Sequence, residues 1–207
     1  MKVIVFGPTG GTGRMLIETA LGRGHSVTAF ARNAAAIEAR PGLTVIVGSA
    51  FEAAAVDAAI AGHDAVLSAL GGRPWRRTPI CMPAIANIAS AMTRHGLRRI
   101  VVISTNGAAE TRRNVGWFER NVLFGFVLAH EVADKEAMER ALAATELDWT
   151  VVRVGMLKNV PATGRVRAVD DGSIHELGKV GRADVAAFMV AQLESDEWKR
   201  RRPVLVG

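Results

Sequence analysis

The chain has 207 residues, of which 49% are hydrophobic and 22% are charged. This length suits one domain of ordinary size, and the composition is too apolar for a disordered chain. The longest uncharged apolar runs, such as residues 122–129, fall far short of the roughly 20 residues that span a bilayer. We therefore expect one domain over residues 1–207, with no transmembrane helix and no membrane partner.

The basic character of the chain does not by itself indicate nucleic-acid binding. Lys and Arg outnumber Asp and Glu by 26 to 20, which gives a formal charge of +6. The basic residues come in short groups interleaved with acids, only 5% of residues are aromatic, and tyrosine is absent. Nucleic-acid binding sites instead combine clustered cations with aromatic side chains that stack on bases. We expect no nucleic-acid partner.

The N-terminus and the cysteine content favour a cytoplasmic protein. The apolar stretch that begins at Val3 ends at Gly7, so it is shorter than the roughly 7–15 residues of a signal-peptide core. Cys81 is the single cysteine and can form no disulfide within the chain, in keeping with a reducing compartment.

Short β-branched runs alternate with helical patterns along the chain. We expect strands at residues 2–6, 26–31, 43–47, 65–69, 99–104, 149–154 and 203–206, and helices at residues 11–23, 51–61, 80–95, 131–144 and 181–193. The strands are nearly all hydrophobic, as expected when helices cover both faces of a sheet. The pattern predicts an α/β fold, a doubly wound parallel sheet of Rossmann-like type with a small C-terminal cap. Residues 155–180 carry Pro, Gly and short apolar pieces, which predicts a lid on the substrate side or a small hairpin.

The turn after the first strand carries the pattern G-x-x-G-x-x-G. Glycines at these points allow a sharp turn, close approach of a pyrophosphate and tight packing of helix on strand. The start of the following helix adds free N–H groups and the positive end of the helix dipole. We predict a dinucleotide at this turn, and the alternative is that its glycines serve packing alone. The predicted binding residues are Gly7, Thr9, Gly10, Gly11, Thr12, Gly13 and Arg14.

The end of the second strand indicates which dinucleotide binds. An acid at this point would bind the ribose 2′-hydroxyl of NAD, whereas an Arg accommodates the 2′-phosphate of NADP. The strand ends without an acid, at Arg32 and Asn33, so the sequence favours NADP over NAD. Arg14 is a second candidate for the phosphate, although an Arg in a first helical turn is often simply exposed.

The fourth strand ends in the same crevice, because ligands of open α/β sheets lie at the carboxyl ends of the strands. The backbone of Leu70 and Gly71 is expected to lie beside this crevice, and Arg73 follows these residues in the sequence. Arg73 either pairs with a phosphate of the cofactor or belongs to a solvated loop.

Five motifs give the chain a family resemblance. They lie at residues 7–13, 27–33, 95–105, 147–153 and 182–186. With them the chain resembles the atypical short-chain dehydrogenase/reductase group, the NAD(P)H-binding proteins that include NmrA-like regulators and the flavin reductase or biliverdin-IXβ reductase type. The resemblance covers nearly the whole chain. The group mixes reductases with cofactor-sensing regulators, so the resemblance implies the fold and the cofactor rather than one activity.

The chain departs from this group at three points. The third strand ends in Gly48-Ser49, where the group commonly has Gly-Asp, so Ser49 stands at the expected adenine contact. The strand that ends near Arg153 is commonly followed by Pro, but here by Val154. Ordinary members of the superfamily use Tyr-x-x-x-Lys, and this chain has no tyrosine.

The catalytic candidates follow from the resemblance. Lys135 stands in the Lys position, with Glu131 where Tyr would be, although an acid four residues before a Lys is also a common ion pair that contributes roughly 0.2–0.5 kcal/mol. His130 is a candidate proton donor or a solvated residue of the helix start. Ser104 and Asn106 close the fifth strand, where a substrate or the nicotinamide carboxamide would lie, although buried polar groups there also satisfy the backbone.

Trp117 lies in the irregular stretch before the fourth helix, and we expect it to line a substrate pocket. The predicted function is an NADPH-dependent reductase that passes a hydride to a small-molecule acceptor, a flavin, a quinone or a similar conjugated ring. The final proton would come from water. The alternatives are a noncatalytic NADP(H) sensor of the NmrA-like type and, less favoured, a nucleotide-sugar epimerase. We expect a monomer or a homodimer and no metal.

Overall fold

The computed structural model describes residues 1–72, 78–108, 111, 116–117, 121, 128–170, 173–174 and 177–207. The strands are β1 (Lys2–Phe6), β2 (Ser26–Ala31), β3 (Leu43–Val47), β4 (Ala65–Ser68), β5 (Arg99–Thr105), β6 (Asp148–Val154), β7 (Met156–Lys158), β8 (Arg167–Val169), β9 (Lys179–Gly181) and β10 (Val204–Val206). The helices are α1 (Gly11–Gly22), the 3-10 turn η1 (Ala34–Ala36), α2 (Ala53–Ile60), α3 (Cys81–Arg94), α4 (Ala129–Ala143) and α5 (Arg182–Ala191). Most bounds lie within two residues of the predicted ones.

The main sheet has the strand order β3-β2-β1-β4-β5-β6-β10-β8. Its strands pair in parallel, except that β8 runs antiparallel to β10 at the edge. This confirms the predicted doubly wound sheet. The strand order reverses between β1 and β4, and in such sheets a ligand binds at the carboxyl ends of the strands beside that point.

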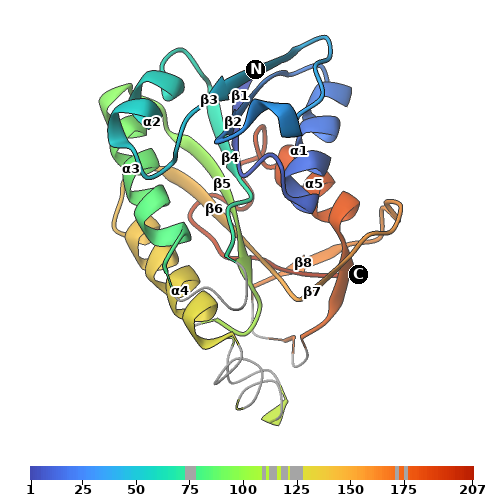
Figure 1. Cartoon of the computed structure of the whole chain (residues 1–207). Helices are drawn as coiled ribbons and strands as arrows, with labels where there is room; N and C mark the ends of the chain where they lie inside the picture. The colour runs from blue at the N-terminus through green and yellow to red at the C-terminus, as the bar shows by residue number, and fades with distance from the viewer. Residues whose placement is uncertain are drawn as a thin grey trace.

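Helices cover both faces of the sheet (Figure 1). α1 and α5 lie together on one face, and α2, α3 and α4 lie on the other. Strand β1 shows why: Val3 and Val5 belong to the core under α1 and α5, whereas Ile4 and Phe6 belong to the opposite core. All four side chains are fully buried. Burial of each such side chain contributes about 1.5–3 kcal/mol, so the unbroken apolar runs are stable only between two helical layers.

Residues 155–180 do not form the small hairpin that we considered. Strands β7 and β9 pair in parallel, and β8 between them leaves to join the edge of the main sheet. The two ends of the segment meet at Gly155, where a Cβ would lie 1.7 Å from the carbonyl oxygen of Leu177. Asp184 fixes the loop before β8, since its carboxylate accepts hydrogen bonds from the amides of Thr163 and Gly164. These are long-range contacts, which local sequence patterns do not encode.

Within the described part of the chain, no helix has both the length and the hydropathy needed to cross a membrane.

Candidate functional site

The three glycines of the G-x-x-G-x-x-G pattern, Gly7, Gly10 and Gly13, have different structural roles. Gly7 has φ +77°, and a Cβ there would lie 2.8 Å from the carbonyl group of Ala69. A Cβ on Gly13 would lie 2.0 Å from the carbonyl oxygen of Gly7. Gly10 differs, because its Cβ would meet only the carbonyl oxygen of Gly7, at 3.6 Å. The outer glycines are therefore required by the protein backbone, whereas the middle one leaves open space, as a bound pyrophosphate requires.

The start of α1 suits an anion. Gly10 caps the helix without a side-chain hydrogen bond, and the first turn holds no acidic residue. The first N–H groups of a helix have no partner within it, and together with the helix dipole they attract phosphate. The backbone of this turn therefore fits a dinucleotide.

A cavity of about 510 Å³ opens beside the turn, at the carboxyl ends of β1 to β4, and we call it the glycine-turn cavity. Of the predicted binding residues it is lined by Gly7, Thr9, Gly10, Arg32, Ser49, Leu70 and Gly71. Phe30, Phe51 and Ala84 also line it and were not predicted. Half-exposed Phe51 offers an apolar ring on the side of the cavity where Ser49 replaces the usual acid. This is the side on which the resemblance places adenine.

The two candidate arginines for a 2′-phosphate lie differently. Arg32 is exposed on the lining of the glycine-turn cavity and forms no hydrogen bond with the described residues. The Nε of Arg14 donates to the carbonyl oxygen of Thr9 at 3.2 Å, and Arg14 lines a separate cavity of about 130 Å³ with Glu18 and Arg40. Arg32 is therefore the better placed of the two. Arg73 lies outside the described residues.

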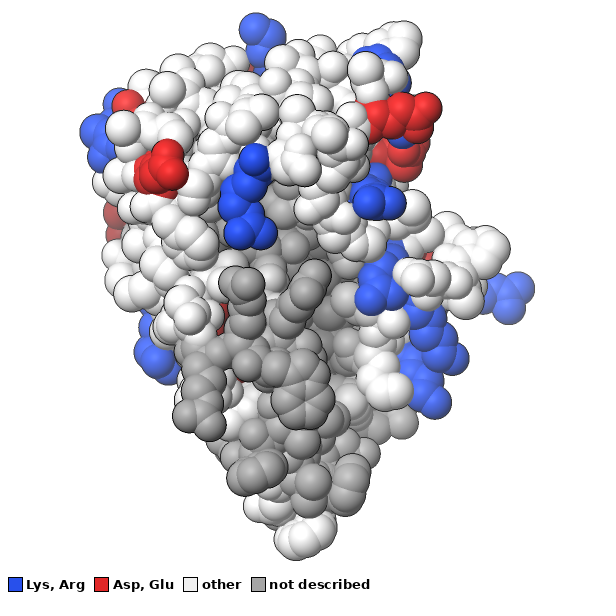
Figure 2. All heavy atoms as spheres, in the orientation of Figure 1, with Lys and Arg blue, Asp and Glu red and all other residues white. Residues whose placement is uncertain are grey.

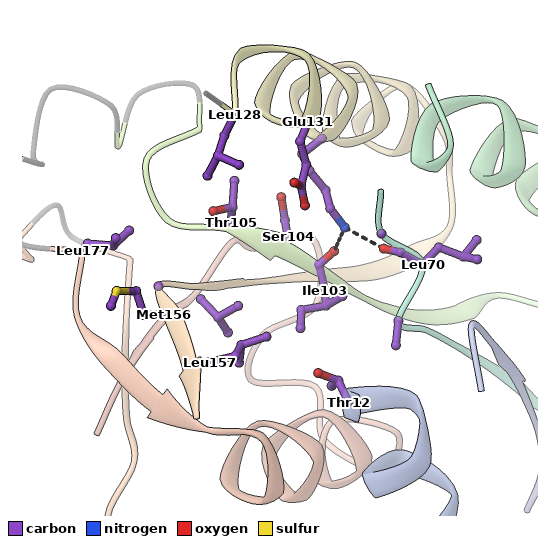
Figure 3. A pocket seen from close by; sticks show the side chains of 15 residues that line it. Thr12, Leu70, Ile103, Ser104, Thr105, Leu128, Glu131, Met156, Leu157 and Leu177 are labelled. Atoms are coloured by element: carbon purple, nitrogen blue, oxygen red, sulfur yellow. Dashed lines mark hydrogen bonds between the residues drawn. The ribbon is translucent and has the colours of Figure 1, made fainter. Parts of the chain in front are cut away.

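A second cavity, of about 420 Å³, lies at the ends of β5 and β6 between α4 and the start of α1 (Figure 3). We call it the Lys135 cavity. Its lining is Thr12, Ala69, Leu70, Gly71, Ile103, Ser104, Thr105, Leu128, Glu131, Lys135, Val154, Gly155, Met156, Leu157 and Leu177. Ala69, Leu70 and Gly71 line both cavities, so the two adjoin at the end of β4. The arrangement matches an extended ligand with one end in each cavity.

Lys135 is held at the wall of its cavity. Its buried Nζ donates to the carbonyl oxygens of Leu70 and Ile103, both at 2.8 Å (Figure 3). Leu70 follows β4 and Ile103 lies near the end of the neighbouring strand β5, so one ammonium group fixes the rim where the two cavities meet.

Asp134, the residue before Lys135, fixes α4 itself. Its buried carboxylate accepts hydrogen bonds from the amides of Ile80, Cys81 and Met82, at 2.7 to 2.9 Å. These are donors at the start of α3, which has no cap of its own. Asp134 therefore locks α4 to α3 and sets the position of the side chains that α4 directs into the cavity.

Glu131 lies one turn before Lys135 and points into the cavity toward Ser104 (Figure 3). Burial raises the pKa of its carboxyl group above the ordinary value. The positive charge of Lys135 works against this shift and the negative charge of Asp134 adds to it. Glu131 is thus the half-buried acid of this cavity.

Ser104 also lines the cavity, but its hydroxyl group is already bound within the protein. It donates to Oε1 of Glu139 at 2.6 Å, and Oε2 of Glu139 accepts from Nη2 of Arg153, also at 2.6 Å. All three side chains are buried. Ser104 was predicted from the sequence but Glu139 was not, because the pair Glu139–Arg153 joins α4 to β6 across the core.

The remaining predicted residues lie outside the two linings. Asn106 is buried and donates from Nδ2 to the carbonyl oxygen of Leu177 at 3.4 Å. His130 is exposed at the start of α4, and Trp117 is 69% exposed. The catalytic role of His130 and the pocket role of Trp117 stay predictions. Met156, Leu157 and Leu177 belong to the predicted lid and do line the Lys135 cavity, although lid motion itself stays a prediction.

Arg182, the first residue of α5, was not predicted as a site residue. A Cβ on Gly11 would lie 2.9 Å from its Nε, so its guanidinium group lies against the start of α1. Nη1 donates to the carbonyl oxygen of Leu157 at 3.2 Å and to Oδ1 of Asn159 at 2.8 Å. Arg182 thus adds a positive charge where α1 already favours an anion. The sequence pointed to Arg182 only through the motif at residues 182–186. That motif was used for the family resemblance and not to assign a binding residue.

Charge on the rest of the surface is mixed. On the face drawn in Figure 2, Lys and Arg side chains are spread among acidic and uncharged residues and gather most toward the right. Among the described residues, no group of three or more His, Cys, Asp or Glu side chains could hold a metal ion. The absence of a nucleic-acid partner stays a prediction.

Known proteins match nearly the whole chain. The model of a family described as NAD(P)H-binding matches residues 7–196. The Arabidopsis thaliana protein At2g34460, described as uncharacterised and chloroplastic, is 31% identical over 213 residues, which cover 95% of this chain and 73% of that protein.

Solved structures match the fold. ChuY of Escherichia coli O157:H7, described as an anaerobillin reductase, superposes with a TM-score of 0.84 and 24% identity over 100% of this chain and 97% of that one. A wide-type short-chain dehydrogenase/reductase of Veillonella parvula, solved in complex with NADP, has a TM-score of 0.82 and 18% identity over 100% and 94% of the chains. Together these matches confirm the resemblance drawn from the sequence motifs.

Proposed function

We propose, since the chain belongs to the NAD(P)H-binding family, that it is an NADPH-dependent reductase acting on a flat conjugated acceptor such as a flavin or a quinone. The observation that best supports this is the pair of cavities that adjoin at Ala69, Leu70 and Gly71. The glycine-turn cavity suits the adenosine half of a dinucleotide. The Lys135 cavity suits the nicotinamide end together with an acceptor.

The residues around the turn would hold the coenzyme. The backbone at Gly10 and the start of α1 would bind the diphosphate, with the guanidinium group of Arg182 beside it. Arg32 would pair with the 2′-phosphate, which favours NADPH over NADH. The neighbour solved with NADP supports this preference.

The Lys135 cavity would receive the acceptor. When bound, the nicotinamide ring supplies the hydride. Leu128, Met156, Leu157 and Leu177 give the cavity an apolar wall, which favours a flat ring and excludes water from it. Lys135 holds the rim between the cavities in one position, as transfer at near-contact distance requires. The neighbour described as an anaerobillin reductase supports reduction rather than another reaction of the group.

A second candidate is a protein that binds NADP(H) without turnover. The chain has no tyrosine, and protein groups already engage the hydroxyl donor of Ser104 and two of the three N–H donors of Lys135. These observations favour a sensor over an alcohol dehydrogenase. They do not weigh against transfer to a conjugated ring, which needs no tyrosine.

The deciding experiment offers FMN, FAD and quinones in turn and follows the loss of NADPH absorbance. Calorimetry with NADPH, NADP and NADH runs beside it. Turnover with one acceptor class supports the reductase. Tight binding of one redox form of the coenzyme, with no oxidation by any acceptor, would support the sensor and contradict the reductase.

A further inference from the structure

We propose that Glu131 is the proton donor of this reduction and gives its carboxyl proton to the acceptor as the hydride arrives. This inference rests on the proposed function, and it replaces the water that the sequence analysis expected as the source of the final proton.

The first argument is position. Glu131 lies in the first turn of α4, lines the Lys135 cavity and directs its carboxyl group into it (Figure 3). Its helix is fixed because Asp134 binds the start of α3. A carboxyl group on a fixed helix keeps one position relative to whatever fills the cavity.

The second argument is availability. Of the cavity's polar side chains, Ser104 donates to Glu139, and Lys135 donates to two backbone carbonyl oxygens. The Glu131 carboxyl group forms no hydrogen bond with any described residue. Among the ionisable side chains that line the described cavity, Glu131 is therefore the one that no hydrogen bond to a described residue holds in place, so its carboxyl group can turn toward a ligand.

The third argument is electrostatic. Burial disfavours the charged carboxylate and so raises the pKa of Glu131 above its ordinary value, which keeps the group protonated to higher pH than an exposed glutamate. The charged groups that act on it are Lys135 and Asp134, both on its own helix. The cavity residues contributed by α1, β5, β6 and β7 are uncharged, and so is Leu177. Once Glu131 has lost its proton, the ammonium group of Lys135 one turn away stabilises the carboxylate.

The step balances as follows in atoms and charge. The acceptor gains a hydride from bound NADPH at one atom, and with it two electrons. The O–H bond of Glu131 breaks while the proton bonds to the acceptor atom that the hydride leaves negative. The reduced acceptor then leaves with two added hydrogens, and the carboxylate of Glu131 takes a proton from solvent.

The test compares Glu131→Gln with the matched control Glu197→Gln, which removes an exposed carboxylate at the far end of the chain. The kcat of both variants and of the natural protein is measured against pH, with saturating NADPH and the best acceptor. We expect Glu131→Gln to lower kcat by about 10²–10⁴-fold, as loss of a general acid does. It should leave the Kd for NADPH unchanged, and the control should match the natural protein. Formate, which can re-supply a carboxylic acid, should restore part of the activity to Glu131→Ala.

A second readout needs neither coenzyme nor acceptor. Carbon-13 labelled glutamate carboxyl groups are titrated by NMR in the natural protein and in Glu131→Gln. The resonance missing from the variant should titrate above the ordinary range of glutamate.

The outcomes separate the two proposals. If the natural protein oxidises NADPH and Glu131→Gln has the same kcat and pH profile, the proton-donor role is wrong and the reductase stands. The same follows if the Glu131 resonance titrates at the ordinary value. If the natural protein binds NADPH but reduces no acceptor, the reductase proposal fails and takes this inference with it.

Discussion

The two cavities of the crevice are built in different ways. The glycine-turn cavity takes its anion-binding part from consecutive residues between β1 and α1. Its shape depends on close backbone contacts at Gly7 and Gly13 that leave no room for a side chain. The Lys135 cavity is assembled from α1, the residues after β4, β5, α4, β6, β7 and Leu177, and its chemistry depends on side chains. The turn therefore tolerates almost no substitution at Gly7 and Gly13, whereas the lining of the Lys135 cavity can change one side chain at a time.

The largest effect should come from Gly13→Ala. Its Cβ would lie 2.0 Å from the carbonyl oxygen of Gly7, a clash with backbone that cannot move away cheaply. We expect a loss of at least about 3 kcal/mol in the free energy of unfolding, which is in the range of severe backbone or core defects. Urea denaturation measures it. Stability equal to that of the natural protein would show that the turn is not held as tightly as the structure indicates.

Gly10→Val should separate binding from folding. The protein leaves space at Gly10, so the added side chain fills the place where a diphosphate would approach. We expect NADPH affinity to fall by more than about 100-fold, or about 2.7 kcal/mol, with an unchanged melting temperature. Calorimetry and thermal unfolding provide the two numbers. If affinity survives, the coenzyme does not bind against this turn.

Arg32→Asp should change the coenzyme preference. An acid at the end of β2 would repel a 2′-phosphate and accept a hydrogen bond from a 2′-hydroxyl. We expect the ratio of NADPH to NADH affinity to fall by about 10–100-fold, or about 1.4–2.7 kcal/mol. Arg14→Asp serves as the comparison and should change the ratio less, because Arg14 lies in a separate cavity. An unchanged ratio for Arg32→Asp would mean that another residue binds the phosphate.

Arg182→Gln should weaken binding modestly. The substitution removes a charge beside the start of α1 but keeps a side chain able to bond Leu157 and Asn159. We expect about a 5–10-fold loss of NADPH affinity, or about 1–1.4 kcal/mol, comparable to one ordinary hydrogen bond, and a weaker dependence on salt. Arg165→Gln, which alters an exposed residue, is the control and should have no effect. Equal affinity for both variants would remove Arg182 from the binding site.

The smallest effect concerns stability and pH. Because the pKa of Glu131 is raised in the folded state, folding favours its protonated form, and the carboxyl group costs stability progressively as pH rises from the unfolded-state pKa to the folded-state pKa. Glu131→Gln should therefore raise the melting temperature at alkaline pH and leave it unchanged in acid, below the unfolded-state pKa. Thermal unfolding across the pH range measures this difference. A lower melting temperature of Glu131→Gln at alkaline pH would mean instead that the charged carboxylate is stabilised in the folded protein.

The sequence predicted the parts of the molecule that are local. Strands such as β1 and β2 are β-branched runs that end at turn residues, so their bounds were close to those observed. The glycine turn was predictable because its three glycines fall between a strand and a helix. Residues joined across the fold were not predictable. Asp134 satisfies the start of α3 from another helix, and Glu139 meets Arg153 only after α4 packs on the sheet.

The segment after β6 shows the same limit. Its two ends pair in parallel as β7 and β9, which requires a connection through β8 at the far edge of the sheet. Several glycines, one proline and short apolar pieces indicate an irregular segment but not which distant strand it joins. Glu131 was seen in the sequence as a replacement for tyrosine, whereas its burial and direction needed the structure.

The short stretch of backbone that separates the two cavities carries one more consequence. Ala69, Leu70 and Gly71 line both cavities, and the ammonium group of Lys135 donates a hydrogen bond to the Leu70 carbonyl oxygen. A ligand that moves these three residues on entering one cavity would change the shape of the other cavity. By thermodynamic reciprocity, the two ligands would then alter each other's affinity by the same factor, and these three residues would carry the coupling between them.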